Sequence, residues 1–462
     1  MPGIIRRTSA ALLTAAVTVA SWSALADVRV WTDQQEIILK GTLRGVEVLP
    51  DTAEPAPLET LVPPPDESAP PLRTVRIAST RALYDAVAAA EPGDRIVLEP
   101  GIYVIDRNSV SLNRPGSAAH PIVITAERMN SAVVRMTGEN GFHVRQPYWI
   151  VENLEIEGAC IRDDTCEHAF HIVGAAHRTI VRHNRIIEFN APIKGNGVND
   201  KDGWLHPDHV LIESNDIYNS RIRDTANPVT GIDVVSGRGW IVRGNYIADF
   251  GKARGNDTSY AAFLKGASAD GLFERNLVVC RQTHSGGQRV GLSFGGGGTN
   301  LGKFCSGSKC DREHYNGTMR NNIVLACNDV GIYLNKAEGS RIFNNMLYDT
   351  QGIDVRFGES TSDIRNNILS GAIRLRDGAA GDRRNNVIVA TPVQFNTWFA
   401  DPQHANFTLI NRNFFVDKSE EVPSLEEDFC GNKRRVGPPD IGPIEFVESK
   451  SCDVAARMKM DN

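Results

Sequence analysis

Short apolar runs that alternate with polar residues recur along most of the chain. The stretch "VRHNRIIEFN" at 181–190 returns as "IESNDIYNS" at 212–220 and "VRGNYIADFG" at 242–251, and four further copies lie between 273 and 372. The Asn residues at the centre of these copies have successive spacings of 31, 31, 30, 31, 46, 23, 22 and 19, and they are Asn153, Asn184, Asn215, Asn245, Asn276, Asn322, Asn345, Asn367 and Asn386. Repeats of about 20–50 residues indicate an array of units that cannot bury an apolar face singly.

The pattern within each unit predicts strands, because it consists of runs of three to five alternately apolar residues, split by Gly, Asn or Asp, with little helical periodicity. Coils of about 22–31 residues with a turn at each corner are typical of a parallel β-helix, in which equivalent residues stack about 4.8 Å apart. An Asn at each corner tolerates a left-handed backbone, and its amide can bond to the Asn above and below. We therefore expect an all-β, single-domain, right-handed parallel β-helix whose Asn ladder is structural.

One helix is predicted before the coils begin. Ser79 or Thr80 can cap it, and Leu83, Val87 and Ala90 share one face. The segment Pro92-Gly93-Asp94 ends it, and strands follow. This helix is expected to cap the N-terminal end of the coils.

The first 26 residues are expected to be a signal peptide. Arg6 and Arg7 precede an apolar run that ends in small residues, which places the cleavage site before Asp27. No other apolar run reaches the roughly 18 residues that a membrane span needs. We therefore expect an exported protein, periplasmic or secreted, without a membrane span.

The rest of the chain divides by composition. Residues 27–71 are expected to be a β-like segment and an extended linker, because 8 of the 23 prolines lie between positions 50 and 71. The β-helix is expected over residues 72–390, and residues 391–462 are expected to form a closing C-terminal segment.

Loss of the signal peptide changes the net formal charge from −6 to −8, because 48 of the 50 basic residues remain against 56 acidic ones. This charge argues against nucleic acid as a partner, whereas an anionic polysaccharide needs only a local basic patch. We expect a monomer.

Eight cysteines in an exported chain are expected to form disulfides. Two pairs are local, Cys160–Cys166 and Cys305–Cys310, and Cys430–Cys452 would close the tail. Cys280 and Cys327 follow repeat Asn residues at almost the same offset, so stacked repeats would bring these two side chains together.

The outward-facing side chains of one strand in each coil form the candidate binding face. Aligning the coils on their repeat Asn residues brings together "AFHIV", "GIDVV", "AFLKG", "GLSFG", "GIYLN" and "GIDVR". The outward column then holds His171, Lys194, Asp233, Lys265 or its neighbour, Ser293, Tyr333 and Asp354. A solvated sheet face without function remains the alternative interpretation.

The segments "ALYDAVAAAEPGDRIVLEPGIY", "HPIVITAE" and "YWIVENLEIEGA" resemble the N-terminal coils of the pectate-lyase-like superfamily of β-helix proteins. The nearest members are chondroitinase B and the alginate lyases of the same polysaccharide lyase family. The stretches "WFADPQHANFTL" and "DFCGNKRRVGPPDIGPIE" are similar to the closing segment of exported carbohydrate-active β-helix proteins. The resemblance covers about residues 74–445 and implies an acidic polysaccharide as partner.

The resemblance also implies roles for individual residues. In the lyase family a Lys acts as base at the sugar's C5, an Arg on the next coil assists as acid, and calcium held by Asn and Glu takes the uronate carboxylate. "FLKGASADGLFERN" is similar to the family's Lys segment, so Lys265 is expected to be the base, with Arg289, Asp233 and His171 as assistants. The chain departs from the family where Phe294 occupies the Arg position, and "NDTSYAAFL" stands where two Glu ligands are expected. Further expected substrate contacts come from Lys194, Tyr333 and His209.

The segment "NGVNDKDGWLHPDHV" lengthens one coil and is rich in acidic residues. Oxygen ligands in a loop over the sheet can hold calcium, so a metal site is expected from Asp200, Asp202 and Asp233. Its His-Pro-Asp-His order is similar to the Asp-Pro-His-Asp motif of mannuronan epimerases. A polar loop that binds no metal is the alternative.

These observations favour a polysaccharide lyase that cleaves a uronate-containing polysaccharide by β-elimination, with calcium as its only expected cofactor. Two alternatives stay open: a non-catalytic polysaccharide-binding or envelope-structural protein, and a uronate C5-epimerase. The glycine-rich stretch "FGGGGTNLGKFCSGSKC" lacks the Gly-Lys-Ser/Thr ending of a phosphate loop, and no helical pattern follows it. We interpret it as a disulfide-clipped loop at the rim of the binding face.

Overall fold

The computed structural model describes residues 23–32, 35–44, 65, 68, 70–106, 109–201, 203–304, 310–389, 391–435, 437–446 and 452–458. The chain divides into two units, Met1–Pro57 and Leu58–Asn462. In the first unit, β1 (Ser23–Thr32) and β2 (Gln35–Arg44) form an antiparallel pair. The predicted cleavage site before Asp27 lies within β1. None of the helices in the described ranges is long and apolar enough to cross a membrane.

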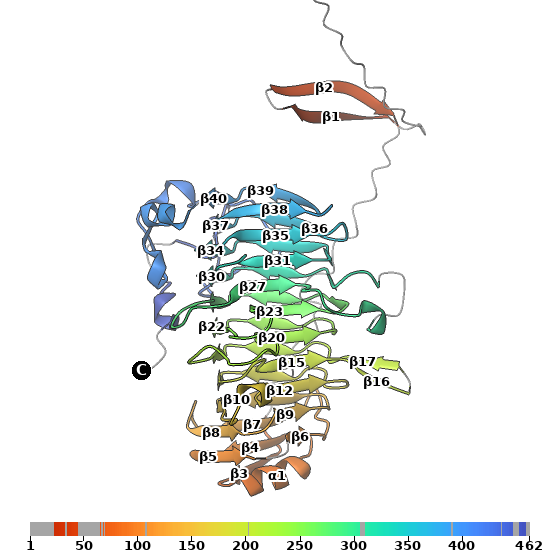
Figure 1. Cartoon of the computed structure of the whole chain (residues 1–462), viewed down its shortest axis with the longest axis vertical. Coiled ribbons are helices and arrows are strands. Elements are labelled where there is room, and N and C mark those ends of the chain that lie inside the picture. The colour runs from red at the N-terminus through yellow and green to blue at the C-terminus, as the bar shows by residue number, and fades with distance from the viewer. Residues whose placement is uncertain are drawn as a thin grey trace, which may run out of the picture. The chain divides into compact units, whose positions relative to one another are not determined.

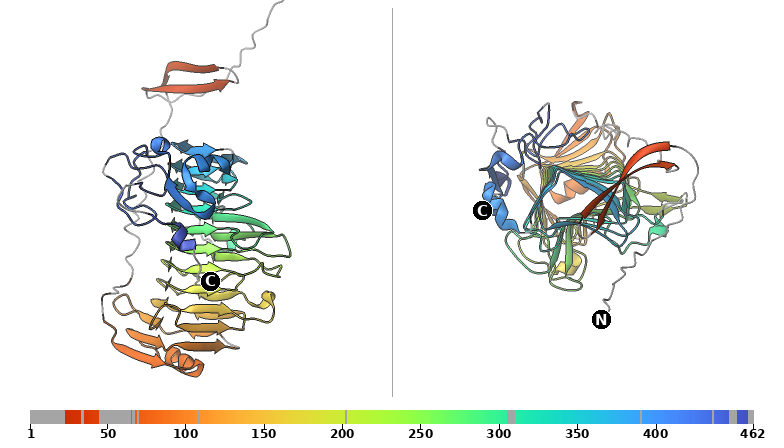
Figure 2. Two further views of the ribbon diagram at one scale, coloured as in Figure 1. Left: turned by 90° about the vertical axis from the view of Figure 1, so that its left-hand side faces the viewer. Right: turned by 90° about the horizontal axis from the view of Figure 1, so that it is seen from above.

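The second unit is a parallel β-helix, as the repeat spacing predicts. Its strands form three long sheets, and successive coils stack along the axis (Figure 1). Seen along that axis, the three sheets enclose a core of triangular section (Figure 2). Each sheet is named here after its first strand.

The β3 sheet has 12 strands. They are β3 (Arg73–Ile77), β4 (Asp94–Leu98), β7 (Ile122–Ala126), β10 (Trp149–Glu152), β13 (Ile180–Arg182), β18 (Leu211–Glu213), β21 (Ile241–Arg243), β25 (Leu272–Glu274), β29 (Thr318–Arg320), β33 (Ser340–Phe343), β36 (Thr361–Arg365) and β39 (Ala380–Arg384).

The β5 sheet has 11 strands. They are β5 (Gly101–Ile105), β8 (Ala132–Met136), β11 (Glu155–Gly158), β14 (Arg185–Ile187), β19 (Asp216–Tyr218), β22 (Tyr246–Ala248), β26 (Leu277–Val279), β30 (Ile323–Leu325), β34 (Met346–Tyr348), β37 (Ile368–Ser370) and β40 (Val387–Val389).

The β6 sheet has 10 strands. They are β6 (Val110–Leu112), β9 (Asn140–Val144), β12 (His168–Val173), β15 (Ile193–Asn196), β20 (Thr230–Val235), β23 (Thr258–Lys265), β27 (Gln288–Phe294), β31 (Ile332–Asn335), β35 (Gly352–Arg356) and β38 (Ala372–Arg376).

Shorter elements decorate this frame. The helix α1 (Thr80–Ala88) packs against β3, β4, β5 and β6 at the N-terminal end of the coils (Figure 1). Three small sheets are made of β16 (Val198–Asp200) with β17 (Gly203–Leu205), of β24 (Ser268–Ala269) with β28 (His314–Tyr315) and β32 (Ala337–Glu338), and of β41 (Phe399–Asp401) with β42 (Asn406–Leu409). Single 3₁₀ turns span Asp163–Thr165, Leu301–Lys303, Pro392–Thr397, Pro402–His404, Arg412–Phe414 and Ala455–Met458.

The predicted capping helix is confirmed. The Ser79 side chain accepts a hydrogen bond from the Ala82 backbone N–H, which satisfies one free donor of the first turn. Leu83 and Val87 are buried, and so is Ala90 just beyond the helix. The apolar face of α1 therefore closes the end of the coil interior, whose core residues would otherwise face water.

The predicted Asn ladder is structural, with two corrections. From Asn215 to Asn386, each ladder side chain accepts hydrogen bonds through Oδ1 from the backbone N–H and the side-chain amide of the preceding ladder Asn, at 2.8–3.1 Å. Asn153 does not join the ladder, because Leu154 occupies the equivalent position in its coil. The left-handed residue at the corner is the one before the ladder Asn, for example His183, Ser214 and Arg275.

A second column of Asn binds the C-terminal segment. In the last coils the residue before the ladder Asn is itself an Asn, and these are Asn321, Asn344, Asn366 and Asn385. Their side-chain amides donate to main-chain oxygens of the C-terminal segment, including Glu427 O at 2.6 Å from Asn321 and Lys418 O at 2.7 Å from Asn385. The doubled "NN" of the later repeats therefore marks the coils against which the tail packs.

We expect that replacing both Asn344 and Asn366 by serine, as found at Ser214, loosens the C-terminal segment without unfolding the coils. Serine is too short to reach the carbonyls of Asp440 and Glu420. Limited proteolysis should then cut within residues 410–446 several times faster than in the parent, while the circular dichroism of the strands stays unchanged. Equal cleavage rates would contradict this role of the second Asn column.

Three predicted disulfides are present, Cys160–Cys166, Cys280–Cys327 and Cys430–Cys452. The second joins adjacent coils, as the equal offsets from the repeat Asn predict. The fourth predicted pair includes Cys305, which lies outside the described residues.

Candidate functional site

The outward-facing column of the β6 sheet contains most of the residues that were predicted for it. Strand register aligns, on successive coils, Ser111, His143, His171, Lys194, Asp233, Phe263, Ser293, Tyr333, Asp354 and Arg374. Phe263, rather than Lys265, stands in the column on β23. Lys265 pairs with Val235 and belongs to the next outward column, two residues further along the strand.

Lys194 and Asp233 form an ion pair at the centre of the column. Their Nζ and Oδ1 atoms are 2.7 Å apart, and only 20% and 8% of the two side chains are exposed. Such a pair, partly shielded from water, holds the two side chains in one geometry. A cation and an anion are therefore fixed side by side on adjacent coils.

Lys265 lies beside this pair in a different state. Its Nζ donates a hydrogen bond to Gly297 O at 3.2 Å and lies 4.4 Å from the centre of the Phe263 ring. Among the described side chains it makes no ion pair. Burial lowers its pKa, which the carboxylates of Asp233 and Glu313 oppose. The Lys265 amine is thereby shifted toward the neutral form that can accept a proton.

Glu313 was not predicted from the sequence. It is buried, and its carboxylate accepts a hydrogen bond from Gly266 N at 2.8 Å. Burial raises its pKa, while the Gly266 bond and the Lys265 charge lower it. No pattern in the chain marks this residue, because it enters the group from a loop rather than from the repeat.

Three histidines adjoin Lys194 on the N-terminal side. The rings of His143 and His168 each lie 5.1 Å from the ring of His171. Burial lowers the pKa of His143 and of His168 to about 4, so both are neutral at physiological pH. His143 and His168 were not predicted, although both lie on the strands that align with "AFHIV".

Hydrogen bonds set which ring nitrogens of this cluster accept. Asn196 Nδ2 donates to Gly197 O, so its Oδ1 is the acceptor for His171 Nε2 at 2.7 Å. His168 Nδ1 donates to Ala191 O, also at 2.7 Å. His171 Nδ1 and His168 Nε2 are therefore acceptors, suited to the hydroxyl groups of a sugar.

At the C-terminal end of the column, the side chains bond to other groups of the protein. Ser293 is buried and donates to the main-chain oxygens of Gly295 and Tyr333. Asp354 forms ion pairs with Arg374 and Arg376. Tyr333 accepts a hydrogen bond from Asn335 Nδ2 at 3.0 Å through its phenol oxygen, and it remains the predicted substrate contact of this end.

Arg289 does not join the group. Its side chain is fully buried at the start of β27, where it donates to Cys280 O and, at 3.1 Å, to Gly286 O. His284 and Asp249 complete its surroundings. Arg289 therefore anchors the turn between β26 and β27, and the expectation that it assists at the column is wrong because its guanidinium points away into that turn.

His209 also lies outside the column. It has a positive φ of 57° just before β18, on the β3 sheet, and its electrostatic neighbours are Arg178, His177, Asp208 and Arg238. It therefore belongs to a corner between sheets rather than to the candidate binding face.

The two predicted calcium ligands that the structure describes, Asp200 and Asp233, do not come together. Asp233 is bound to Lys194, whereas Asp200 is exposed on the β16–β17 hairpin, and Asp202 lies outside the described residues. Within the part of the chain that the structure describes, no group of three or more His, Cys, Asp or Glu is arranged to hold a metal ion. The described residues do not fit a calcium site, and we derive no step through one.

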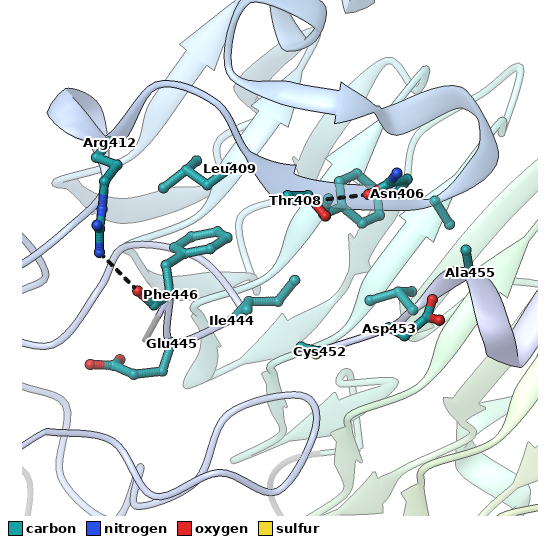
Figure 3. Close-up of a pocket in the computed structure, with 13 residues that line it drawn as sticks. Asn406, Thr408, Leu409, Arg412, Ile444, Glu445, Phe446, Cys452, Asp453 and Ala455 are labelled. Carbon is teal, nitrogen blue, oxygen red and sulfur yellow. Dashed lines mark hydrogen bonds between the residues drawn. The ribbon is translucent and has the colours of Figure 1, made fainter. Parts of the chain in front are cut away.

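Two cavities lie against the C-terminal segment instead. One, of about 610 Å³, is open to one side and is lined by β42 and the segments around Ile444 and Val454, with Leu409 and Phe446 on its wall (Figure 3). The other, of about 760 Å³, lies between the β5 sheet and the C-terminal segment and includes Arg281 and His404. Neither is lined by a residue of the β6 sheet.

Comparison with known proteins agrees with this architecture. Residues 77–234 match the family model of Chondroitinase B, a segment that includes His171, Lys194 and Asp233 but ends before Lys265. Pectate lyase L of Dickeya chrysanthemi is 31% identical over 87 residues, which is 16% of this chain and 20% of that protein. The match thus spans about a fifth of the length of this curated relative.

Among solved structures, pectate lyase Pel9A aligns with a TM-score of 0.55 at 14% sequence identity, over 82% of this chain and 97% of that one. A rhamnogalacturonan lyase aligns with a TM-score of 0.48 at 13% identity, over 84% and 98% of the two chains. The first alignment shows that the two chains share one fold, which in this chain is the parallel β-helix.

Proposed function

We propose that the chain is an exported polysaccharide lyase that cleaves a uronate-containing polysaccharide by β-elimination, with Lys265 as the base. The observation that carries this proposal is the state of the Lys265 amine. It is partly buried, has a lowered pKa, and lies beside the Lys194–Asp233 pair without an ion pair of its own among the described residues. Partial removal from water shifts a lysine toward its neutral form, which is the form that takes up a proton in catalysis.

The chemistry needs few groups. The neutral Lys265 amine takes the proton from C5 of the uronate, and the electron pair of that C–H bond forms the C4–C5 double bond. The C4–O glycosidic bond breaks, and the leaving oxygen takes up a proton, for which the newly formed Lys265 ammonium is the nearest source. Lys194 is placed to attract the uronate carboxylate, and the neutral His171 and His168 to accept hydrogen bonds from sugar hydroxyls.

The comparisons support this substrate class. The Chondroitinase B model covers the coils that carry His171, Lys194 and Asp233, and the relative with 31% identity is a pectate lyase. Export, predicted from residues 1–26, fits a polymer that is found outside the cell.

The decisive assay follows the ultraviolet absorbance of unsaturated uronate ends. Alginate, chondroitin sulfate, dermatan sulfate and pectate are each incubated with the mature protein, with added calcium and with a chelator. We expect a steady rise with one polymer class, and equal rates with calcium and chelator, because the described residues form no calcium cluster. A flat trace with every polymer would overturn the lyase proposal.

A second candidate is a binding protein that uses the same column without turnover. It is favoured by Arg289, which is buried and provides no acid beside Lys265. Polysaccharide binding without product, and without C5 hydrogen exchange in heavy water, would support it. Hydrogen exchange without unsaturated product would indicate a C5-epimerase instead.

The pH dependence gives a further prediction. The rate should rise with pH as Lys265 loses its proton, with a midpoint below the ordinary lysine value of about 10.4, because burial lowers its pKa. In Asp233→Asn the midpoint should move to lower pH, since the lost carboxylate favoured the ammonium form and Lys194 is left uncompensated. Asp354→Asn, on the same column but paired with arginines, is the control and should leave the midpoint in place. A shift to higher pH in Asp233→Asn would contradict the assignment.

A further inference from the structure

Two insertions leave the same edge of the β6 sheet on either side of Lys265. The β16–β17 hairpin follows β15, and a glycine-rich loop, residues 295–304, follows β27. The strand order β15-β20-β23-β27 places two coils between them. Both insertions project from the right-hand side of the stack in Figure 1.

The insertions touch each other across the two intervening coils. The rings of Trp204, on the hairpin, and Phe304, at the end of the loop, are 4.9 Å apart and inclined at 56°. Trp204 also lies parallel to His206, at 6.2 Å. The two aromatic side chains therefore bridge the C-terminal ends of β20 and β23, where Lys265 is the last residue of its strand.

Both insertions are held to the coil that carries the candidate base. His206 directly follows the hairpin, and its Nδ1 is 2.8 Å from Ser236 Oγ. The backbone N–H of Ser236 in turn donates to Lys265 O at 2.7 Å. In the loop, Gly297 O accepts the hydrogen bond from Lys265 Nζ. The bridge is thus continuous with the candidate site rather than a separate surface feature.

Trp204 is exposed where the other described tryptophans on the β-helix unit are not. It is 37% exposed, whereas Trp149, Trp240 and Trp398 are at most 6% exposed. Neighbouring Leu205 is 41% exposed. A large aromatic surface left in water is costly to folding, and its usual gain is a ligand that covers it. The apolar face of a pyranose ring, with its row of C–H groups, has the flat shape and polarity to stack on an indole while its hydroxyls stay in water.

We propose that Trp204, backed by Phe304, is a stacking subsite for a sugar ring of the polysaccharide, next to the ring that is processed at Lys265. The identity of the polymer rests on the proposed function, whereas the subsite itself rests on the exposed indole and its contact with the loop. The subsite binds a ring that does not react, so it contributes to affinity and positioning and takes no part in proton transfer.

The test measures binding in a Lys265→Ala background, so that turnover does not consume the ligand. Affinity is measured by isothermal titration calorimetry with long oligosaccharides of alginate, chondroitin, dermatan and pectate, and with one neutral mannan, while quenching of tryptophan fluorescence is followed in the protein that keeps Trp204. We expect quenching by one of these polymers and about tenfold weaker binding in Trp204→Ala, with partial recovery in Trp204→Phe. Phe414→Ala, which removes a 48% exposed aromatic ring in the C-terminal segment, is the matched control and should bind like the parent.

Unchanged affinity in Trp204→Ala, or no quenching with any polymer, would overturn the subsite. The two proposals fail separately. Weaker binding in Trp204→Ala together with an inactive parent protein would leave the subsite standing and remove the lyase. An active lyase whose KM is unaltered by Trp204→Ala would leave the lyase proposal standing and remove the subsite.

Discussion

Replacing Lys265 by alanine is expected to lower the elimination rate about 10²–10⁴-fold, the usual contribution of a positioned general base. The amine has no carboxylate partner in the described ranges, so its loss breaks no ion pair. KM should change little, because Lys194 remains to attract the uronate carboxylate. Initial rates measured by ultraviolet absorbance, with equal circular dichroism for parent and variant, decide the matter.

Two further variants separate base catalysis from simple charge. Lys265→Arg keeps a cation that does not lose its proton, and it should be as inactive as the alanine variant. Lys336→Ala removes a lysine from the same edge of the sheet, where it is paired with Glu359 at 2.9 Å, and should stay active. Substantial activity in Lys265→Arg would exclude the amine as base.

Replacing Asn245 by alanine is expected to lower the free energy of unfolding by about 3–9 kcal/mol, since it leaves three buried groups unpaired at about 1–3 kcal/mol each. The Asn245 Oδ1 accepts from the backbone N–H and the side-chain amide of Asn215, and its own amide donates to Ile212 O. No water reaches these groups, because Asn215 and Asn245 are fully buried.

Guanidinium chloride unfolding, followed by far-ultraviolet circular dichroism, measures this loss. Asn256→Ala is the control, because Asn256 is exposed outside the ladder, and it should unfold with the parent. Equal unfolding midpoints for Asn245→Ala and the parent would show that the ladder contributes no net stability.

The register of the binding face shows where prediction from the repeat ends. Counting from the ladder Asn placed His171, Asp233, Ser293, Tyr333 and Asp354 correctly on one column. It left open whether Lys265 or a neighbour belongs there, and Phe263 does. The reason is that the turn between the strand and the next ladder Asn varies in length from coil to coil, and an extra residue there leaves the apolar pattern unchanged.

Arg289 and Glu313 also could not be placed from the repeat: Arg289 was expected at the candidate site and lies away from it, whereas Glu313 was not expected there and lies beside Lys265. Arg289 lies on a strand of the candidate face, yet its long side chain folds back to the carbonyls of Cys280 and Gly286. Glu313 lies far from the column in sequence, yet its loop returns it to Gly266, beside Lys265. Neither outcome depends on spacing.

The coils, their stacking, the Asn ladder, the capping helix and the Cys280–Cys327 disulfide could all be predicted from the sequence. These features are periodic or local, so that hydrophobic spacing and corner residues are sufficient to specify them. Only the folded chain shows that Asp233 pairs with Lys194 while Lys265 has no ion pair among the described residues, and that Trp204 meets Phe304. These contacts depend on the exact paths of loops and long side chains between coils, which a repeat that encodes only buried strands does not specify.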